Sequence, residues 1–178
     1  MSLPNHKQTA VWLIVSAVLL ATLIPGGPVE NRDFSHIHPV ILSAFNVFLT
    51  VLNLGSFALA YFAYHRHNWS LRTSFFVATA YFAVYAIDLA QIFPQSPTPM
   101  SFALALIEVL GMTAAVPLMF SARTASTAQS APVTENKSFR TSLVAAMVAL
   151  GIGIVWFATD AAMNSDGHGA QQINGVEH

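Results

Sequence analysis

The stretch ENRDFSHIHPVILSAFNVFLTVLN, residues 30–53, decides how this chain can fold. Its first part, residues 30–38, is short and polar, and Pro39 then opens a long apolar run. Four polar side chains recur within that run at spacings of three, four and three: Ser43, Asn46, Thr50 and Asn53. These spacings place all four on one face of a helix. In a membrane we expect this face to turn away from lipid, towards other helices or a cavity.

The composition of the whole chain indicates a membrane protein. Of its 178 residues, 54% are hydrophobic and 8% are charged, whereas soluble domains carry about 25% charged residues. The apolar residues come in long blocks, so we expect membrane lipids to be the first partner of the chain. A net charge of −1 argues against a nucleic-acid partner, because phosphate binding requires a basic surface. Without cysteine, disulfides and thiolate metal sites are excluded.

Five apolar runs predict an all-α fold, an antiparallel bundle of five transmembrane helices within residues 1–160. The predicted spans cover about residues 10–24, 39–64, 71–93, 100–121 and 139–159. A segment rich in Ser, Thr and Ala, residues 122–138, is typical of a cytoplasmic linker, and residues 161–178 are typical of a disordered extracytoplasmic tail. The first run also resembles the apolar region of a cleaved signal peptide, but no good cleavage site follows it, so we expect an uncleaved helix.

Lysine and arginine are distributed unevenly over the two sides of this bundle. On one side of the alternation lie Lys7, Arg66, Arg72, Arg123, Lys137 and Arg140. On the other side lies only Arg32. Cytoplasmic loops carry the excess of positive charge in membrane proteins. We therefore predict a multi-pass protein of the cell (inner or plasma) membrane, with a cytoplasmic N-terminus and an extracytoplasmic C-terminus.

Three of the predicted spans carry a polar residue at one depth. At a rise of about 1.5 Å per residue, Asn46, Asp88 and Glu108 lie roughly 8–12 Å below the outer surface. Arg32 precedes the second span on the same side and is the only Lys or Arg available to pair with either carboxylate. The candidate ligand-binding residues are these four and the polar residues that share their helices: Arg32, Asn46, Asn53, Tyr81, Tyr85, Asp88, Gln91 and Glu108.

This convergence favours an outward-facing intramembrane cavity that binds a small molecule, a lipid headgroup or an ion. An intramembrane carboxylate costs a few kcal/mol to insert, so its presence indicates function by default. Two carboxylates in one low-dielectric region resist ionising together, which would allow proton-coupled behaviour. In the alternative interpretation, the polar groups only hydrogen-bond between helices, and the chain is an accessory or structural subunit of a larger membrane complex without its own ligand.

Enzyme signatures are absent from the sequence. No GxSxG, HExxH or Walker A pattern occurs, so a non-enzymatic role is favoured. The less favoured alternative is a membrane-embedded enzyme that uses Asp88 and Glu108 as acid and base. No histidine lies well inside a predicted span, where a bound haem would require it, and we expect no cofactor.

The polar segment before the second span contains the residues that could hold a metal ion. These weak candidates are Glu30, Asp33, His36 and His38. A His-x-His pair in a loop fixes neither the ligand geometry nor a second shell of hydrogen bonds, and solvated loop histidines are the commoner case. We therefore predict no metal site.

Overall fold

The computed structural model describes residues 4–24, 29–30, 32–127 and 137–163, and these contain helices but no β-strand. The helices are α1 (Asn5–Ala21), α2 (Pro39–Tyr64), α3 (Asn68–Leu89), α4 (Phe102–Thr127) and α5 (Lys137–Met163). The predicted all-α fold is therefore confirmed for this part of the chain. Three of the helices, α2, α3 and α4, are long and apolar enough to cross a membrane.

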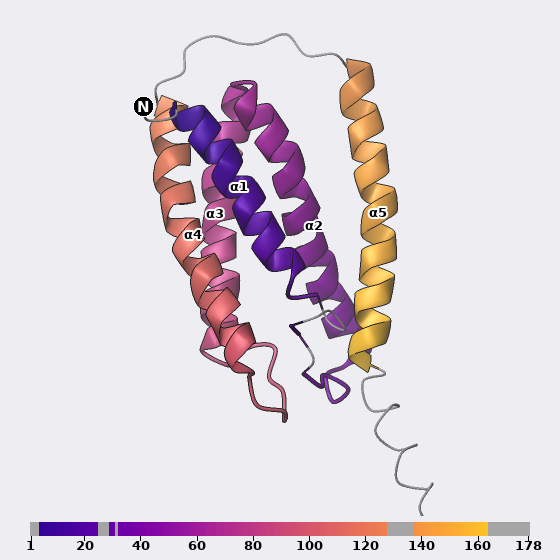
Figure 1. Cartoon of the computed structure of the whole chain (residues 1–178). Coiled ribbons are helices and arrows are strands. Elements are labelled where there is room, and N and C mark those ends of the chain that lie inside the picture. Colours follow the sequence, from indigo (N-terminus) through magenta and orange to yellow (C-terminus); the bar gives the residue numbers. More distant parts are fainter. Residues whose placement is uncertain (1–3, 25–28, 31, 128–136, 164–178) are drawn as a thin grey trace, which may run out of the picture.

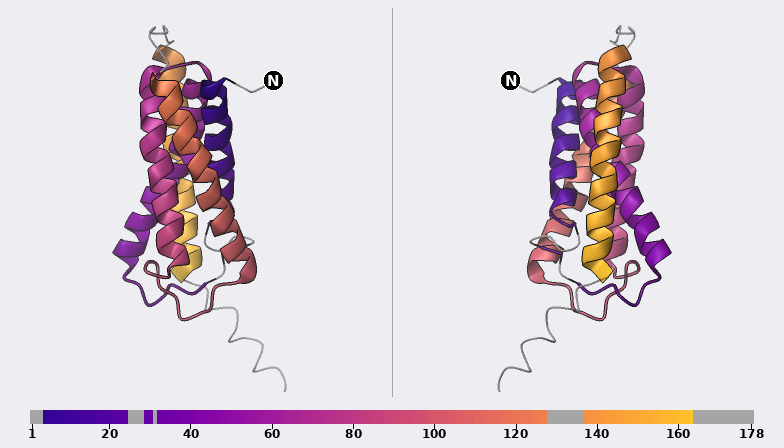
Figure 2. Two further views of the ribbon diagram at one scale, coloured as in Figure 1. Left: turned by 90° about the vertical axis from the view of Figure 1, so that its left-hand side faces the viewer. Right: turned by 90° about the vertical axis from the view of Figure 1, so that its right-hand side faces the viewer.

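Consecutive helices run in opposite directions along one common axis (Figures 1 and 2). Helices α1 to α4 form a closed bundle in which α3 packs along α4 and α1 packs against both α2 and α4. Helix α5 stands to one side and, among the described helices, packs against α2 alone. The start of α1 and the end of α5 lie at opposite ends of the bundle (Figure 1).

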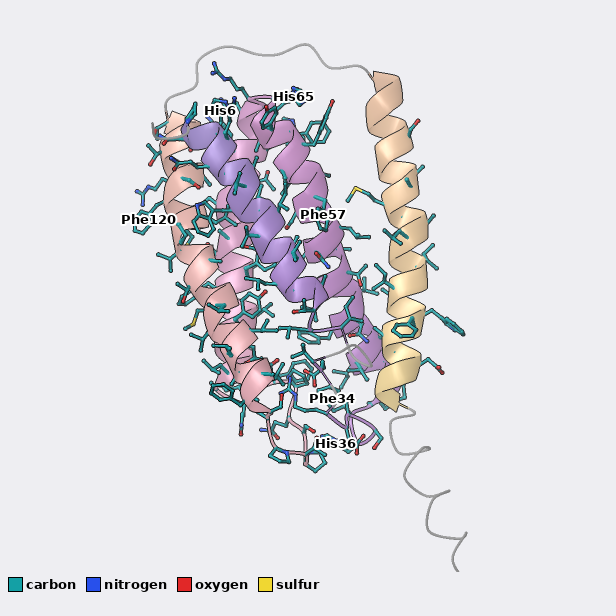
Figure 3. All side chains as sticks on the ribbon, in the orientation of Figure 1. His6, Phe34, His36, Phe57, His65 and Phe120 are labelled. Carbon is teal, nitrogen blue, oxygen red and sulfur yellow. The ribbon has the colours of Figure 1, made fainter. Side chains whose placement is uncertain are left out.

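Large apolar side chains cover the outer surface of the bundle. Phe102 is 83% exposed, Trp156 73% and Phe76 71%. Figure 3 shows Phe120 and Phe57 on the outside of the bundle as well. Water-soluble proteins rarely expose so many large apolar groups in contiguous areas, whereas lipid-facing surfaces require them. Together with the length of α2, α3 and α4, this surface indicates that the chain associates with a membrane.

Helix α4 is longer than its apolar pattern predicts. It continues to Thr127, so the predicted linker 122–138 is wrong for its first residues. The hydroxyl groups that made this segment resemble a linker bond instead to carbonyls of the same helix. Thr124, for example, donates to the carbonyl of Phe120 at 2.8 Å. Such bonds satisfy the hydroxyl inside a helix. The rest of the linker, from residue 128 to 136, lies outside the described residues.

Helix α3 ends at Leu89, four residues before the predicted end of the third span. The reason is local: Gln91 adopts a positive φ of 54°, and the N–H of Ile92 donates to the carbonyl of Ile87 at 3.0 Å. A left-handed residue followed by this backbone bond is a common way for a helix to end. At the other termini, α1 begins at Asn5 rather than near residue 10, and of the predicted tail only residues 161–163 are described, inside α5.

Candidate functional site

Arg32 lies at the end of the bundle where α2 begins and α3 ends, in the segment that precedes α2. Its side chain is buried, and it reaches α3 to form a two-pronged ion pair. Nη1 donates to Oδ1 of Asp88 at 2.9 Å, and Nη2 donates to Oδ2 at 2.9 Å. Paired parallel bonds of this kind are the strongest arrangement between a guanidinium and a carboxylate. Arg32 thereby ties the loop to the end of α3.

The same guanidinium also binds Glu30, which is 3% exposed. Nε of Arg32 donates to Oε1 of Glu30 at 3.0 Å, and Nη2 donates to Oε2 at 2.6 Å. The ring of Phe34 lies 5.3 Å from the guanidinium carbon, within range of a cation–π contact. Burial acts to lower the pKa of Arg32, but the hydrogen bonds with Glu30 and Asp88 outweigh it and raise this pKa. Arg32 is therefore a permanent positive charge.

Glu108 of α4 is the group in this region whose charge the ion pairs leave uncompensated. Its side chain is fully buried, and no N–H or hydroxyl group of the described residues donates to Oε1 or Oε2, whereas the carboxyl group of Asp88 lies within hydrogen-bonding reach. Glu108 lies within electrostatic range of Asp88 and Arg32. The hydroxyl of Tyr85 is also buried without a described hydrogen-bond partner, and it interacts electrostatically with Glu108. We call Glu30, Arg32, Asp88 and Glu108 the carboxylate cluster.

Two hollows adjoin this cluster, and Arg32 borders both. The inner cavity, about 40 Å³, is lined by Glu30, Arg32, Asp88 and Tyr85 among others. It has room for a few water molecules or one small ion, since roughly 10–15 Å³ of such volume holds one water. The outer pocket, about 560 Å³, is formed by Arg32, Gln91 and the loop of residues 94–100. Arg32 and Pro94 therefore border both the roomy outer pocket and the small inner cavity, whereas Glu108 is among the lining residues of neither.

Three residues of the polar stripe of α2, Asn46, Thr50 and Asn53, are buried, whereas Ser43 is half-buried. Of the four, only Asn46 reaches the cluster. Asn46 lines the inner cavity and donates from Nδ2 to the Thr159 hydroxyl of α5 at 3.1 Å. Asn53 is buried two helical turns further along, where its Oδ1 has no described partner. Both residues also line a separate cavity of about 30 Å³ that involves α1, α2 and α5. The structure therefore places Asn46 beside the carboxylate cluster and Asn53 away from it.

The remaining predicted site residues lie on α3 or at its end. Tyr85 stacks on Tyr81, with ring centroids 6.2 Å apart, and lines the inner cavity. The Tyr81 hydroxyl instead donates to the Ser56 hydroxyl of α2 at 2.9 Å, so Tyr81 joins two helices rather than entering the cluster. Gln91 is exposed and borders only the outer pocket.

The loop residues considered as metal ligands have other partners. Asp33 accepts hydrogen bonds from the backbone N–H of Ser35 at 2.7 Å and from its hydroxyl at 3.1 Å. His38 caps α2 by accepting from the N–H of Val40 at 3.3 Å. His36 is exposed at this end of the bundle, and Figure 3 shows His6 and His65 at the opposite end. Within the described ranges, no three His, Asp or Glu side chains gather in a way that could hold a metal ion.

Sequence reasoning missed the pairing of Glu30 with Arg32 and the contact of Phe34. A signal for both was present in the spacing of the three residues. Glu30, Arg32 and Phe34 alternate with other residues, and alternate residues of an extended segment point to the same side. Ser56, which holds Tyr81, had no such signal, because a serine inside a helix normally bonds to its own backbone.

One comparison with known proteins identifies a family. The model of a family described as "Domain of unknown function (DUF8051)" matches residues 5–139. The matched residues cover helices α1 to α4, and with them all four members of the carboxylate cluster, but only the start of α5. No curated protein and no solved structure matches the chain. Since the family model covers well over half of the sequence, the chain belongs to the DUF8051 family.

Proposed function

We propose that this chain is a five-span integral membrane protein that binds one positive charge, a proton or a small monovalent cation, between the two carboxyl groups of Glu108 and Asp88, from the extracytoplasmic side. One observation carries the proposal: Glu108 is fully buried with its carboxyl group against that of Asp88, and no described N–H or hydroxyl group donates to either of its oxygens. A buried, unpaired carboxylate costs several kcal/mol, so a proton or a cation bound there would stabilise the folded protein.

The balance of charge in the cluster supports a positive ligand. Three carboxyl groups, those of Glu30, Asp88 and Glu108, face the single guanidinium of Arg32. Arg32 already forms charge-assisted bonds with Glu30 and Asp88, so among the described residues Glu108 supplies negative charge that is not paired with a cation of its own. The inner cavity is also too small for an organic ligand, because sites for such molecules measure roughly 300–1,000 Å³.

The arrangement of the helices supports access from the extracytoplasmic side. The outer pocket is formed by the loop of residues 94–100, which joins α3 to α4. The uneven distribution of Lys and Arg predicts that this end of the bundle lies outside the cell. A hydrated ion would enter the outer pocket, lose water at Arg32 and reach the inner cavity, which is lined by Asp88, the neighbour of Glu108.

Reporter fusions test the five-span topology. We expect alkaline phosphatase, which is active only outside the cytoplasm, to be active when fused after Gln95 or at the C-terminus and inactive when fused after Ser130. The physical basis is the positive-inside distribution of charge. Activity after Ser130, or none at the C-terminus, would show that the proposed orientation is wrong.

Infrared spectroscopy of the purified protein tests the ligand. If the ligand is a proton, the wild type should show the C=O band of a protonated carboxylic acid, and Glu108→Gln should lack it. If the ligand is a cation, Na⁺ or K⁺ should raise the unfolding temperature of the wild type at constant ionic strength, because a ligand of the folded state stabilises it. Glu108→Gln should abolish that rise.

The control for both measurements is Asp160→Asn, which removes an exposed carboxylate of α5. It should leave both the infrared band and the response to cations unchanged. Glu108→Gln should itself be as stable as the wild type or more stable, since it removes a buried charge. A wild type with neither the infrared band nor a response to cations would contradict the proposed function.

A further inference from the structure

Helices α2 and α5 enclose a groove, the α2–α5 groove, of about 900 Å³ that the carboxylate cluster does not use. It exists because α5 packs against α2 alone and because a small residue on α2 leaves space between them. A Cβ atom built on Gly55 would have no other atom within 4 Å, so this side of the groove is open. At the hydrogen bond between Asn46 and Thr159 the two helices are held together.

The lining of this groove changes from polar to apolar along its length. Ser43, Thr159 and Asp160 lie at the end where α2 begins and α5 approaches its end. Beyond them the walls are almost entirely aliphatic, with Trp156 near the polar end. A molecule that matches this groove therefore has one polar end and a long apolar body. Asp160 adds a negative charge at the polar end, which favours a cationic group there.

We propose that the α2–α5 groove binds one acyl chain of a membrane phospholipid, with an ammonium-bearing headgroup such as ethanolamine beside Asp160. Lipid binding here presupposes the membrane-spanning arrangement proposed above, but it does not depend on ion binding at Glu108.

Native mass spectrometry of the full-length protein tests this site. The protein is equilibrated with vesicles of equal parts phosphatidylethanolamine and phosphatidylglycerol and then released in mild detergent. We expect the wild type to retain one phosphatidylethanolamine per chain. Gly55→Leu should reduce this retention at least tenfold, because the new side chain occupies the groove. Ala58→Leu, a second substitution of a lining residue, should do the same.

The matched control is Gly153→Leu on α5, where a Cβ also meets open space but the residue does not line the groove. This variant should retain lipid as the wild type does. Asp160→Asn should retain lipid but lose the preference for ethanolamine over glycerol headgroups. Equal retention by the wild type, Gly55→Leu and Ala58→Leu would overturn the proposal. So would a wild type that releases lipid and forms dimers or copurifies with another subunit. Neither result would change what is expected from the infrared and unfolding measurements on Glu108→Gln, so the two proposals can fail separately.

Discussion

Arg32→Gln should lower the free energy of unfolding by about 3–5 kcal/mol, the cost of removing one partner from a buried ion pair. Glutamine is uncharged, so Glu30 and Asp88 would both lose their cation inside the bundle, beside a third carboxylate at Glu108. Chemical and thermal unfolding of the purified protein in a single detergent would measure the loss. Arg72→Gln, which removes an exposed arginine of α3, is the control and should change stability by less than about 0.5 kcal/mol.

A second substitution separates a lost pair from general damage. If unpaired carboxylates cause the loss, adding Asp88→Asn to Arg32→Gln should restore part of the stability, because one of the stranded charges is gone. The two substitutions would then be strongly non-additive, as expected for residues in direct contact. Additive losses, or an Arg32→Gln variant as stable as the wild type, would show that the ion pair contributes little and that its carboxylates reach water.

Gly111→Ala should lower the free energy of unfolding by about 1–3 kcal/mol, the usual cost of overpacking a core. A Cβ atom at this position would overlap the ring of Tyr85, which is buried and stacked on Tyr81. The Tyr85 ring cannot simply turn away, because it stacks on Tyr81, and Tyr81 is held in place by its hydrogen bond to Ser56 of the neighbouring helix α2. Thermal unfolding in the same detergent would measure the effect.

Two comparisons make this result specific to the Tyr85 contact. Gly153→Ala, on α5, adds a Cβ in open space and should be neutral or stabilising by about 0.5–1 kcal/mol, because alanine favours helix more than glycine does. In the Gly111→Ala background, Tyr85→Leu should recover stability, since the overlapping atoms belong to the far side of the ring. If Tyr85→Leu does not restore the stability lost in Gly111→Ala, the overlap with the Tyr85 ring is not the cause of that loss.

Much of the site follows from simple periodicity and depth. The spacing of three and four residues predicted that Asn46 turns inward, and counting from the ends of the apolar runs placed Asp88 and Glu108 at one depth; the structure shows that these two also interact. The pairing of Arg32 with a carboxylate followed because no other Lys or Arg was available on that side. Such arguments work because a helix has a fixed rise and a fixed turn.

The parts that could not be predicted depend on local backbone conformation. The sequence grouped Glu30 with the histidines as a metal candidate, whereas it pairs with Arg32, because the path of the segment before α2 decides which way its side chains point. A shared helix face also placed Asn53 and Tyr81 with the cluster, although both lie further along the bundle. The size of the inner cavity had no sequence signal, since it is the small space left after all neighbouring side chains have packed.

The position of Arg32 between the outer pocket and the inner cavity has a kinetic consequence. In the proposed route an ion passes the guanidinium, and any movement of the guanidinium breaks bonds to two carboxylates. Exchange at Glu108 would then be slow compared with free diffusion, and its rate would be set by the ion pairs rather than by the width of an opening. Under the proposed function, such slow exchange would let Glu108 and Asp88 hold a bound charge for long intervals.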